Sequence, residues 1–390
     1  MTSTASTVIH SVRLISSGLD RSDAYVAFAD GRVLATGKGR SWREFTGDDT
    51  DVVDGAGHVL TPGLIDIHNH GGAGASYSEG DGAIRTARRF HRQHGTTRQL
   101  LSLVTASPED LISQLHIAAA EARRDHTILG IHLEGPFLAL EYRGAHDPSL
   151  LRDPDPDLVR RLLDAADGTL RQVTMAPERV HFAESARILS EAGVVVAVGH
   201  TGATFEQTRA AIEAGATLLT HAFNGMPGMH HRAPGPVMAF VEDSSGRIEV
   251  INDGAHVRAE VVGMLCRLAP GRVVLVSDAM AAAGAGDGTY RLGNLDVEVA
   301  EGVARLTEGD TIAGSTITLH VAVANAVRNV GLTPLAAIEA ATVVPAQVLG
   351  VENRLGRLEP GYLADAVLFD GDWQVRDVWI AGRPIGEWEH

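Results

Sequence analysis

Short runs of apolar, β-branched residues recur along the middle of the chain, and a loop and a stretch with helical periodicity follow each run. Eight such runs lie at residues 63–70, 98–105, 128–133, 171–176, 194–199, 217–221, 247–252 and 272–277. Apolar strands that alternate with helices are typical of a parallel sheet with both faces covered. Eight strand–helix units in a row predict a (β/α)8 barrel of the TIM type.

Capping residues mark where the first helices begin and end. Residues 80–93 read as a helix closed near Gly95, because glycine favours the left-handed backbone that follows a last helical turn. Ser107 and Pro108 precede two acidic residues and mark the start of another helix. These signals place helices after the first two predicted strands.

The two ends of the chain follow a different pattern. Residues 1–60 contain short β-patterned pieces separated by Asp-Gly and glycine-rich turns, and a similar pattern returns over residues 350–390. We therefore expect one discontinuous small β-sandwich domain formed by residues 1–60 and 350–390. The (β/α)8 barrel, as the catalytic domain, is expected over residues 61–349.

Composition narrows the classes of partner. The chain has 390 residues and is 44% hydrophobic, enough for a barrel with a small accessory domain. A formal net charge of −16 argues against a nucleic-acid partner, so an anionic substrate needs a local basic pocket. No stretch of about 18 uncharged apolar residues occurs, so we expect no membrane span and no membrane partner.

Cysteine and lysine are each represented once. Cys266, the only cysteine, excludes an internal disulfide and reads most simply as a small buried side chain. With no signal-peptide pattern at the N-terminus, we expect a cytoplasmic location. The only lysine, Lys38, precedes the barrel. A Schiff-base or carbamylated lysine in the barrel is therefore excluded.

Residues that can bind a metal ion fall at the ends of the predicted strands. A single buried histidine is usually structural, but strand ends share one face of a barrel, where active sites form. A mixed nitrogen and oxygen set suits zinc or a similar divalent ion. Two of the histidines are two positions apart on one strand, so they point the same way. The set consists of His68, His70, Glu134, His200, His221 and Asp278.

Further polar residues lie in the predicted loops. Asn224, the Gly225 amide, Arg232 and His256 can together hold a phosphate, because a guanidinium fork and backbone N–H groups suit phosphate oxygens. Their structural alternatives are a capping asparagine, a surface arginine and a structural histidine. His146 is a candidate for polarising a substrate carbonyl, or it anchors its loop by a hydrogen bond.

A glycine lies ahead of the last apolar helical stretch. Gly314 follows Ile312 and Ala313 and permits close approach of the backbone to a ligand. The Gly-Ser pair is also typical of an ordinary helix N-cap.

In order, the chain contains PGLIDIHNHG, HLEGPF, GAHDP, VGHTGAT, THAFNGM, DGAH, VSDAM and AGST. Over roughly residues 60–320 these motifs resemble the N-acetylglucosamine-6-phosphate deacetylases of the amidohydrolase superfamily. The resemblance implies a metal ion bound by Glu134, His200 and His221, with Asp278 as catalytic acid and base. It also implies sugar-phosphate contacts from Ala145, Asn224, Gly225, Arg232, His256, Ile312, Ala313 and Gly314.

The resemblance implies further properties. In relatives the residue that matches Arg232 reaches the neighbouring subunit's site, which implies a homodimer. Some members lack the first-strand histidines, whereas this chain has both, so it can hold one ion, or two with the second between His68, His70 and Glu134. Zinc is the expected metal, with iron, cobalt, manganese and nickel as alternatives. The implied reaction converts N-acetyl-D-glucosamine 6-phosphate and water to D-glucosamine 6-phosphate and acetate.

Two other functions fit parts of the pattern. One is a different amidohydrolase, such as a dihydroorotase-like amidase or a dipeptidase. Many of those enzymes use a carbamylated lysine, and the lysine-free barrel argues against them. The other is a non-catalytic relative that binds a sugar phosphate, against which the presence of Asp278 argues.

Overall fold

The computed structural model describes residues 4–388, which fall into two compact units. One unit comprises residues 66–90 and 99–318, and the remaining described residues form the other. The domain boundaries expected near residues 60 and 350 stay a prediction. Residues 1–3 and 389–390 of the predicted terminal domain lie outside the described residues.

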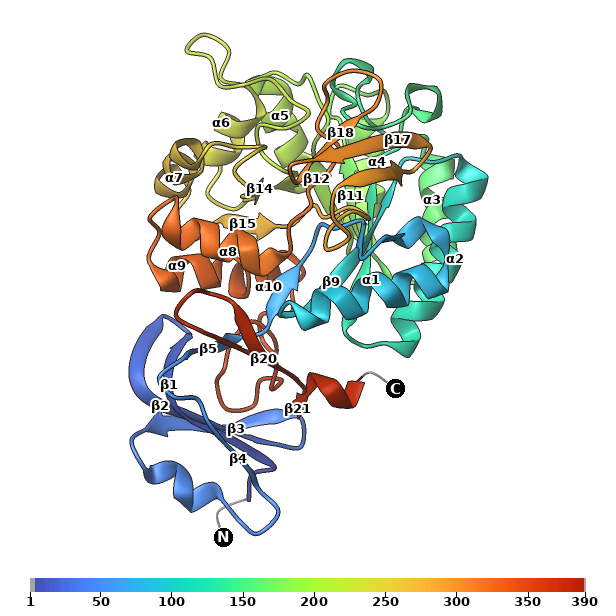
Figure 1. Ribbon diagram of the computed structural model, residues 1–390. Helices are drawn as coiled ribbons and strands as arrows, with labels where there is room; N and C mark the ends of the chain where they lie inside the picture. Colours follow the sequence, from blue (N-terminus) through green and yellow to red (C-terminus); the bar gives the residue numbers. More distant parts are fainter. Residues whose placement is uncertain (1–3, 389–390) are drawn as a thin grey trace. The chain divides into compact units, whose positions relative to one another are not determined.

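Eight strands form the parallel sheet that the hydrophobic pattern predicted (Figure 1). They follow one another around the sheet in chain order, and their registers are parallel. The strands are β6 (Leu64–Asp66), β9 (Thr96–Val104), β10 (Ile128–Glu134), β11 (Leu170–Met175), β12 (Val195–Val198), β13 (Ala216–Leu219), β14 (Arg247–Ile251) and β15 (Val273–Val276). Each overlaps one of the predicted runs, and the barrel fold is confirmed.

Hydrogen bonds connect the two ends of this sheet. The Ser277 hydroxyl donates to the Asp66 carboxylate over 2.6 Å, and the Asp278 N–H donates to the His68 carbonyl over 2.9 Å. The barrel is therefore nearly closed, and the residues that follow its first and last strands lie next to each other.

Helices connect the strands and begin at the caps that the sequence indicates. The Ser107 hydroxyl accepts from the Asp110 N–H, and Pro108 occupies the first turn. Within residues 4–388, no helix is both long and apolar enough to cross a membrane. The helices are α1 (Asp81–Gln93), α2 (Pro108–Arg124), α3 (Pro156–Ala166), α4 (Phe182–Glu191), α5 (Phe205–Glu213), α6 (Gly235–Glu242), α7 (Ala259–Leu268), α8 (Leu319–Arg328), α9 (Pro334–Glu339) and α10 (Val343–Val348). Short 3₁₀ helices span Ser41–Phe45, Tyr77–Glu79, Leu140–Tyr142, Pro148–Leu150 and Ile385–Trp388.

Strands from both termini build one mixed sheet, which confirms that the ends of the chain share a β-structure. The antiparallel pairing of β5 with β19 joins the two ends. The members are β1 (Thr7–Ser16), β2 (Leu19–Ala29), β3 (Arg32–Lys38), β4 (Asp51–Asp54), β5 (Val59–Pro62), β19 (Ala366–Phe369), β20 (Val375–Ile380) and β21 (Arg383–Pro384). Apolar side chains on one face pack into a core that includes Ile9, Phe28, Leu60 and Trp379.

Two small sheets were not foreseen from the pattern. A two-stranded ribbon, β7 (Gly71–Gly72) and β8 (Ala75–Ser76), follows the first barrel strand. A three-stranded antiparallel sheet follows the last one and consists of β16 (Gly288–Leu292), β17 (Leu295–Ala300) and β18 (Val303–Leu306). Its apolar face packs with Val104, Ala145 and Ala313.

Candidate metal centre and active site

The six side chains that the sequence singled out as metal ligands come together at the carboxyl ends of the barrel strands. Each of these residues ends its strand or follows it by a few positions, and all six are buried. Their elements are β6 for His68 and His70, β10 for Glu134, β12 for His200, β13 for His221 and β15 for Asp278.

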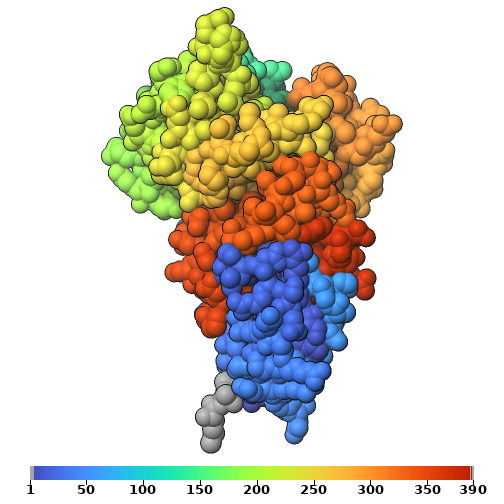
Figure 2. Space-filling view, turned by 90° about the vertical axis from the view of Figure 1, so that its left-hand side faces the viewer, coloured from blue at the N-terminus to red at the C-terminus, as the bar shows by residue number. Residues whose placement is uncertain are grey.

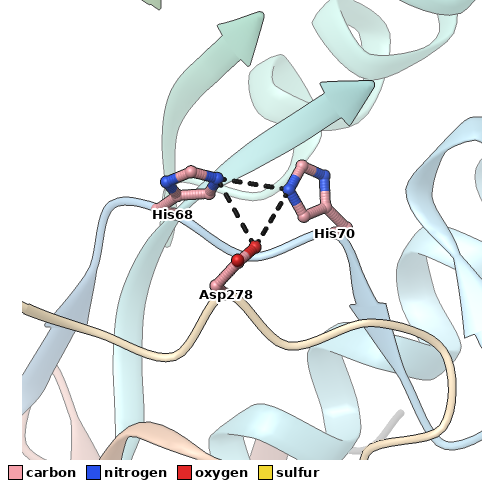
Figure 3. Close-up of side chains that lie close together, drawn as sticks. All are labelled: His68, His70 and Asp278. Carbon is pink, nitrogen blue, oxygen red and sulfur yellow. Dashed lines mark hydrogen bonds and ion pairs between the residues drawn. The ribbon is translucent and has the colours of Figure 1, made fainter. Parts of the chain in front are cut away.

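His68, His70 and Asp278 form what we call the first-strand cluster (Figure 3). The Nε2 atoms of the two histidines lie 3.2 Å apart. Asp278 Oδ1 lies 3.2 Å from His70 Nε2 and 3.6 Å from His68 Nε2. The three potential ligand atoms therefore face one another (Figure 3).

Glu134, His200 and His221 form a second group, the central cluster. Glu134 Oε1 lies 3.1 Å from His200 Nε2 and 2.9 Å from His221 Nε2, and these two nitrogens are 3.0 Å apart. The other oxygen, Glu134 Oε2, lies 3.1 Å from His70 Nε2. Glu134 thus touches both clusters.

Three of these six residues have backbone conformations that non-glycine residues rarely adopt. His200, His221 and Asp278 have φ values of 47°, 23° and 48°. A non-glycine residue in such a region costs on the order of 1–3 kcal/mol and persists where the surrounding structure holds it. All three strained residues follow a barrel strand and belong to the ligand set. Backbone strain at such positions is typical of a functional site.

Hydrogen bonds at the second ring nitrogen hold three of the histidines. His200 Nδ1 lies 2.9 Å from the Tyr142 carbonyl, and His70 Nδ1 lies 3.2 Å from the Ser102 carbonyl. His68 Nδ1 instead lies 3.0 Å from a carboxylate oxygen of Glu249. Because these oxygens only accept, each Nδ1 carries a hydrogen, and each Nε2 is the ring nitrogen that faces the clusters.

Electrostatics favour the anionic form of both carboxylates. Burial opposes ionisation of Glu134, but the charge of His68 and hydrogen bonds from neighbouring histidines hold its pKa well below the usual range. Asp278 behaves similarly, because His68 and His70 outweigh burial and lower its pKa. Burial also opposes the charged form of His70, yet Asp278 and Glu134 raise its pKa to about 9.

The donor set fits a divalent metal. Two lone-pair nitrogens 3.0–3.2 Å apart repel each other unless a cation or a proton lies between them. Ligand atoms around tetrahedral zinc, each about 2.0–2.1 Å from the ion, lie roughly 3.3 Å from one another. The distances within both clusters match that spacing, and imidazole with carboxylate is a donor set that zinc and iron accept. The two buried clusters could hold two ions.

A cavity of about 270 Å³ opens beside the clusters. Glu134, His200, His221, His70 and Asp278 line it, so both clusters contribute to its wall. The other residues that line it are Gly144, Ala145, His146, Phe223, Asn224, Gly225, Ile251, His256, Leu292, Thr311, Ile312 and Gly314.

Comparison with known proteins connects this site to a family. Residues 59–385 match the amidohydrolase family. The N-acetylgalactosamine-6-phosphate deacetylase of Escherichia coli O157:H7 is 38% identical over 336 residues, which is 85% of this chain and 89% of that protein. The N-acetylglucosamine-6-phosphate deacetylase of Homo sapiens is 36% identical over 348 residues, covering 85% of this chain and 84% of that protein.

A solved structure supports the same relationship. It is the N-acetyl-D-glucosamine-6-phosphate deacetylase of Mycobacterium smegmatis, an aspartate-to-alanine mutant in complex with N-acetyl-D-glucosamine-6-phosphate. It is 41% identical, aligns with a TM-score of 0.92, and the match covers 97% of this chain and 99% of that one. The chain belongs to the N-acetylglucosamine-6-phosphate deacetylase family of amidohydrolases. The family expected from the sequence motifs is therefore confirmed.

Most of the expected sugar-phosphate residues line the cavity of this deacetylase. They are Ala145, Asn224, Gly225, His256, Ile312 and Gly314. Gly225 has φ 59°, and a Cβ atom there would lie 2.7 Å from His200 Nδ1, so only glycine fits. His146 also lines the cavity, with Nε2 3.5 Å from Glu134 Oε2.

Two expected residues do not line this cavity. Ala313 is fully buried in the apolar cluster against the three-stranded sheet. Arg232 is exposed in the loop before α6, where its guanidinium donates to His231 Nε2 over 2.7 Å. That loop, yellow-green in Figures 1 and 2, projects from the surface.

Glu249 is a residue of this deacetylase that the sequence reasoning missed. It lies inside the barrel on β14 with no exposed surface, against His68. The signal was present, because one acidic residue interrupts the apolar run RIEVI. Leu292 and Thr311 were also missed, since they reach the cavity from segments that follow the eighth strand.

Proposed function

We propose that this deacetylase hydrolyses the acetamide of N-acetyl-D-glucosamine 6-phosphate and releases D-glucosamine 6-phosphate and acetate. The observation that carries the proposal is the convergence of six imidazole and carboxylate side chains beside one cavity, five of which line its wall. The cavity is slightly smaller than the roughly 300–1,000 Å³ of typical small-molecule sites, as suits a single phosphorylated monosaccharide.

Each cluster has a role in this proposal. Glu134, His200 and His221 would hold one divalent ion, for which zinc is the expected metal. His68, His70 and Asp278, with Glu134 shared between the clusters, would hold a second ion. When bound, the metal lowers the pKa of a water from about 15.7 toward about 7 and polarises a carbonyl oxygen.

Asp278 is the proposed proton carrier. It lines the cavity, and its lowered pKa keeps it ionised and able to accept a proton from the attacking water. The water oxygen bonds to the acetyl carbon, and the proton passes from Asp278 to the amide nitrogen as the C–N bond breaks. A neutral amine then leaves, which makes cleavage feasible at neutral pH.

His146 is the proposed donor to the carbonyl oxygen. Burial lowers its pKa to about 4 even though Glu134 favours the charged form. The ring is therefore neutral at pH 7 and carries a single N–H. That hydrogen can stabilise the negative charge that develops on the carbonyl oxygen, which is a large contribution in many amide hydrolases.

The phosphate group would bind at the side of the cavity formed by Asn224, Gly225 and His256. Burial opposes a charge on His256, but a 2.7 Å contact of its Nδ1 with Asp253 outweighs burial and raises its pKa. A protonated imidazole together with amide donors suits a phosphate in a chain with one lysine. The sugar-phosphate contacts expected from Ala145 and from the backbone near Ile312 and Gly314 fit the places of these residues in the wall.

A homodimer is proposed as the working form. Arg232 does not line the cavity of its own chain, and its loop projects outward (Figure 2). Arg232 of one copy would then reach the phosphate in the cavity of a second copy. We also propose a cytoplasmic location, since a chain with the single cysteine Cys266 forms no internal disulfide.

Loss of Arg232 tests the dimer. Arg232→Ala should raise KM for the phosphorylated sugar about tenfold, with a smaller effect on the plain sugar, because a charge-assisted contact to phosphate is lost. Mixing Arg232→Ala chains with Asp278→Asn chains should restore activity, since a mixed dimer contains one complete site. Equal weakening of both sugars, or no recovery on mixing, would contradict a shared site.

An acetate-release assay tests the function. Purified protein with its metal content measured on the same sample is given N-acetylglucosamine and N-acetylgalactosamine, each with and without a 6-phosphate. We expect release from N-acetylglucosamine 6-phosphate at the highest kcat/KM. N-acetylgalactosamine 6-phosphate is the second candidate substrate, because the chain is 38% identical to an N-acetylgalactosamine-6-phosphate deacetylase. No acetate from any metal-loaded mixture would indicate a non-catalytic relative.

A further inference from the structure

Glu249 is a buried carboxylate that the proposed reaction does not use. It lies on β14 with no exposed surface, and three N–H donors surround its two oxygens. Oε2 lies 3.0 Å from His68 Nδ1 and 3.3 Å from the His221 backbone N–H, and Oε1 accepts from Gln172 over 2.9 Å. A carboxylate removed from water to this extent is costly unless such partners compensate it.

The carboxylate acts on one ligand ring. Because it accepts the Nδ1 hydrogen of His68, it holds that ring with Nε2 directed at His70 and Asp278. A carboxylate behind a ligating histidine also makes the imidazole a stronger donor to a cation. Its contact with His221 is to the backbone, so the His221 ring is not held by it.

No other ligand histidine of the two clusters has this arrangement among the described contacts. His70 and His200 are held by backbone carbonyls, of Ser102 and Tyr142, and His221 Nδ1 has no partner. A carbonyl fixes the ring but adds no full negative charge. The two clusters therefore differ in charge behind the ligands as well as in the ligands themselves.

Charge makes this difference important. Two divalent ions bring four formal positive charges into a buried site, while Glu134 and Asp278 offset two of them. The Glu249 carboxylate, against the His68 ring, offsets part of the remaining positive charge at the first-strand cluster. With a single ion in the central cluster, Glu134 and Asp278 already match its charge.

We propose that Glu249 is a positioning residue that retains a metal ion in the first-strand cluster and leaves the affinity of the central cluster nearly unchanged. This inference rests on the two-ion part of the proposed function. It goes further by assigning to one residue, outside both clusters, the choice between a one-ion and a two-ion site.

The test uses Glu249→Gln, which keeps the size of the side chain and an acceptor oxygen for His68 but removes the charge. Gln172 Oε1 has no partner and can turn to face the new amide, so the variant is expected to fold. Gln172→Met is the matched control, because it removes a neighbouring contact of Glu249 and leaves the His68 contact in place.

Metal-free protein is titrated with zinc against a chromophoric chelator, and ions per chain are measured by mass spectrometry after dialysis. Wild type and Gln172→Met should hold two ions. Glu249→Gln should hold one with wild-type affinity and bind the second about 10- to 100-fold more weakly. The spectrum of bound cobalt should lose the contribution of the second ion only.

Three results would overturn the inference. Two ions held by Glu249→Gln with wild-type affinities would show that the carboxylate does not retain the ion, while the two-ion proposal would survive. Equal loss of both ions in Glu249→Gln would show general damage to the barrel interior. A wild-type protein that binds one ion would remove both proposals. If Glu249→Gln does not fold, Glu249→Asp, which retracts the carboxylate, must show the same selective loss.

Discussion

The two ligand clusters lie next to each other but differ in their access to the substrate. All three residues of the central cluster, Glu134, His200 and His221, line the cavity. In the first-strand cluster His70 and Asp278 line it, whereas His68 lies behind them with no exposed surface. All of the central cluster is therefore open to the cavity, whereas the first-strand cluster reaches it through His70 and Asp278.

The clusters also differ in how the chain holds them. His200 and His221 occupy left-handed backbone positions directly after their strands, while His68 and His70 do not. His68 is instead held from inside the barrel by Glu249. The central cluster takes both of its histidines from strained turns at the rim, whereas in the first-strand cluster only Asp278 occupies such a position. Two neighbouring ligand sets can therefore be tuned separately.

The largest expected effect separates the two roles of Asp278, ligand and proton carrier. Asp278→Asn keeps the shape of the side chain but cannot accept a proton, so kcat should fall about 10³- to 10⁴-fold. Steady-state kinetics together with metal content on the same sample measure this. Near-normal turnover with normal metal content would defeat the proposed mechanism.

A direct comparison of the clusters follows from His200→Asn and His68→Asn. The central cluster lines the cavity, so His200→Asn should lower kcat/KM by about 10²- to 10³-fold, since the metal ion it would hold contributes several kcal/mol. His68→Asn should lower kcat/KM about tenfold, mainly because the second ion is retained more weakly. Both variants are assayed at the same fixed zinc concentration, and metal content is measured on the same samples. A larger loss from His68→Asn would reverse the assignment of the two clusters.

The smallest expected effect is on KM and comes from a substitution beside the cavity wall, outside both clusters. Asp253 raises the pKa of His256, so the charged imidazole is present below that pKa and lost as pH rises through it. Asp253→Asn should lower the pKa of His256, so KM should begin to rise at a lower pH than in wild type. At neutral pH the KM of the variant should be about threefold higher. The kcat should stay unchanged. The pH profile of KM for wild type and variant measures this, and identical profiles would remove His256 from the phosphate site.

Local pattern was sufficient for the barrel and for most of the cavity. The apolar runs marked all eight strands, because a strand covered on both faces is rich in apolar, β-branched residues. His68 and Asp278 could be placed on the same face of the barrel in advance, since both follow predicted strands. Ala313 shows the limit, because which residue of a loop faces a ligand depends on backbone angles that neighbouring residue types do not reveal.

The antiparallel sheet of β16–β18 also escaped prediction, because it depends on contacts made outside the regular strand–helix repeat. Arg232 lies in an exposed loop, so its predicted role requires a second copy of the chain, which a single sequence does not display.

The order of the strands and the placing of ligand-type residues at their ends came from the sequence alone, because hydrophobic periodicity and strand ends are local properties. The tertiary structure decided which atoms meet. His68 and Glu249 are 181 positions apart, yet their atoms lie 3.0 Å from each other inside the barrel. Such a contact exists only once the sheet curves and nearly closes, so no local pattern could specify it.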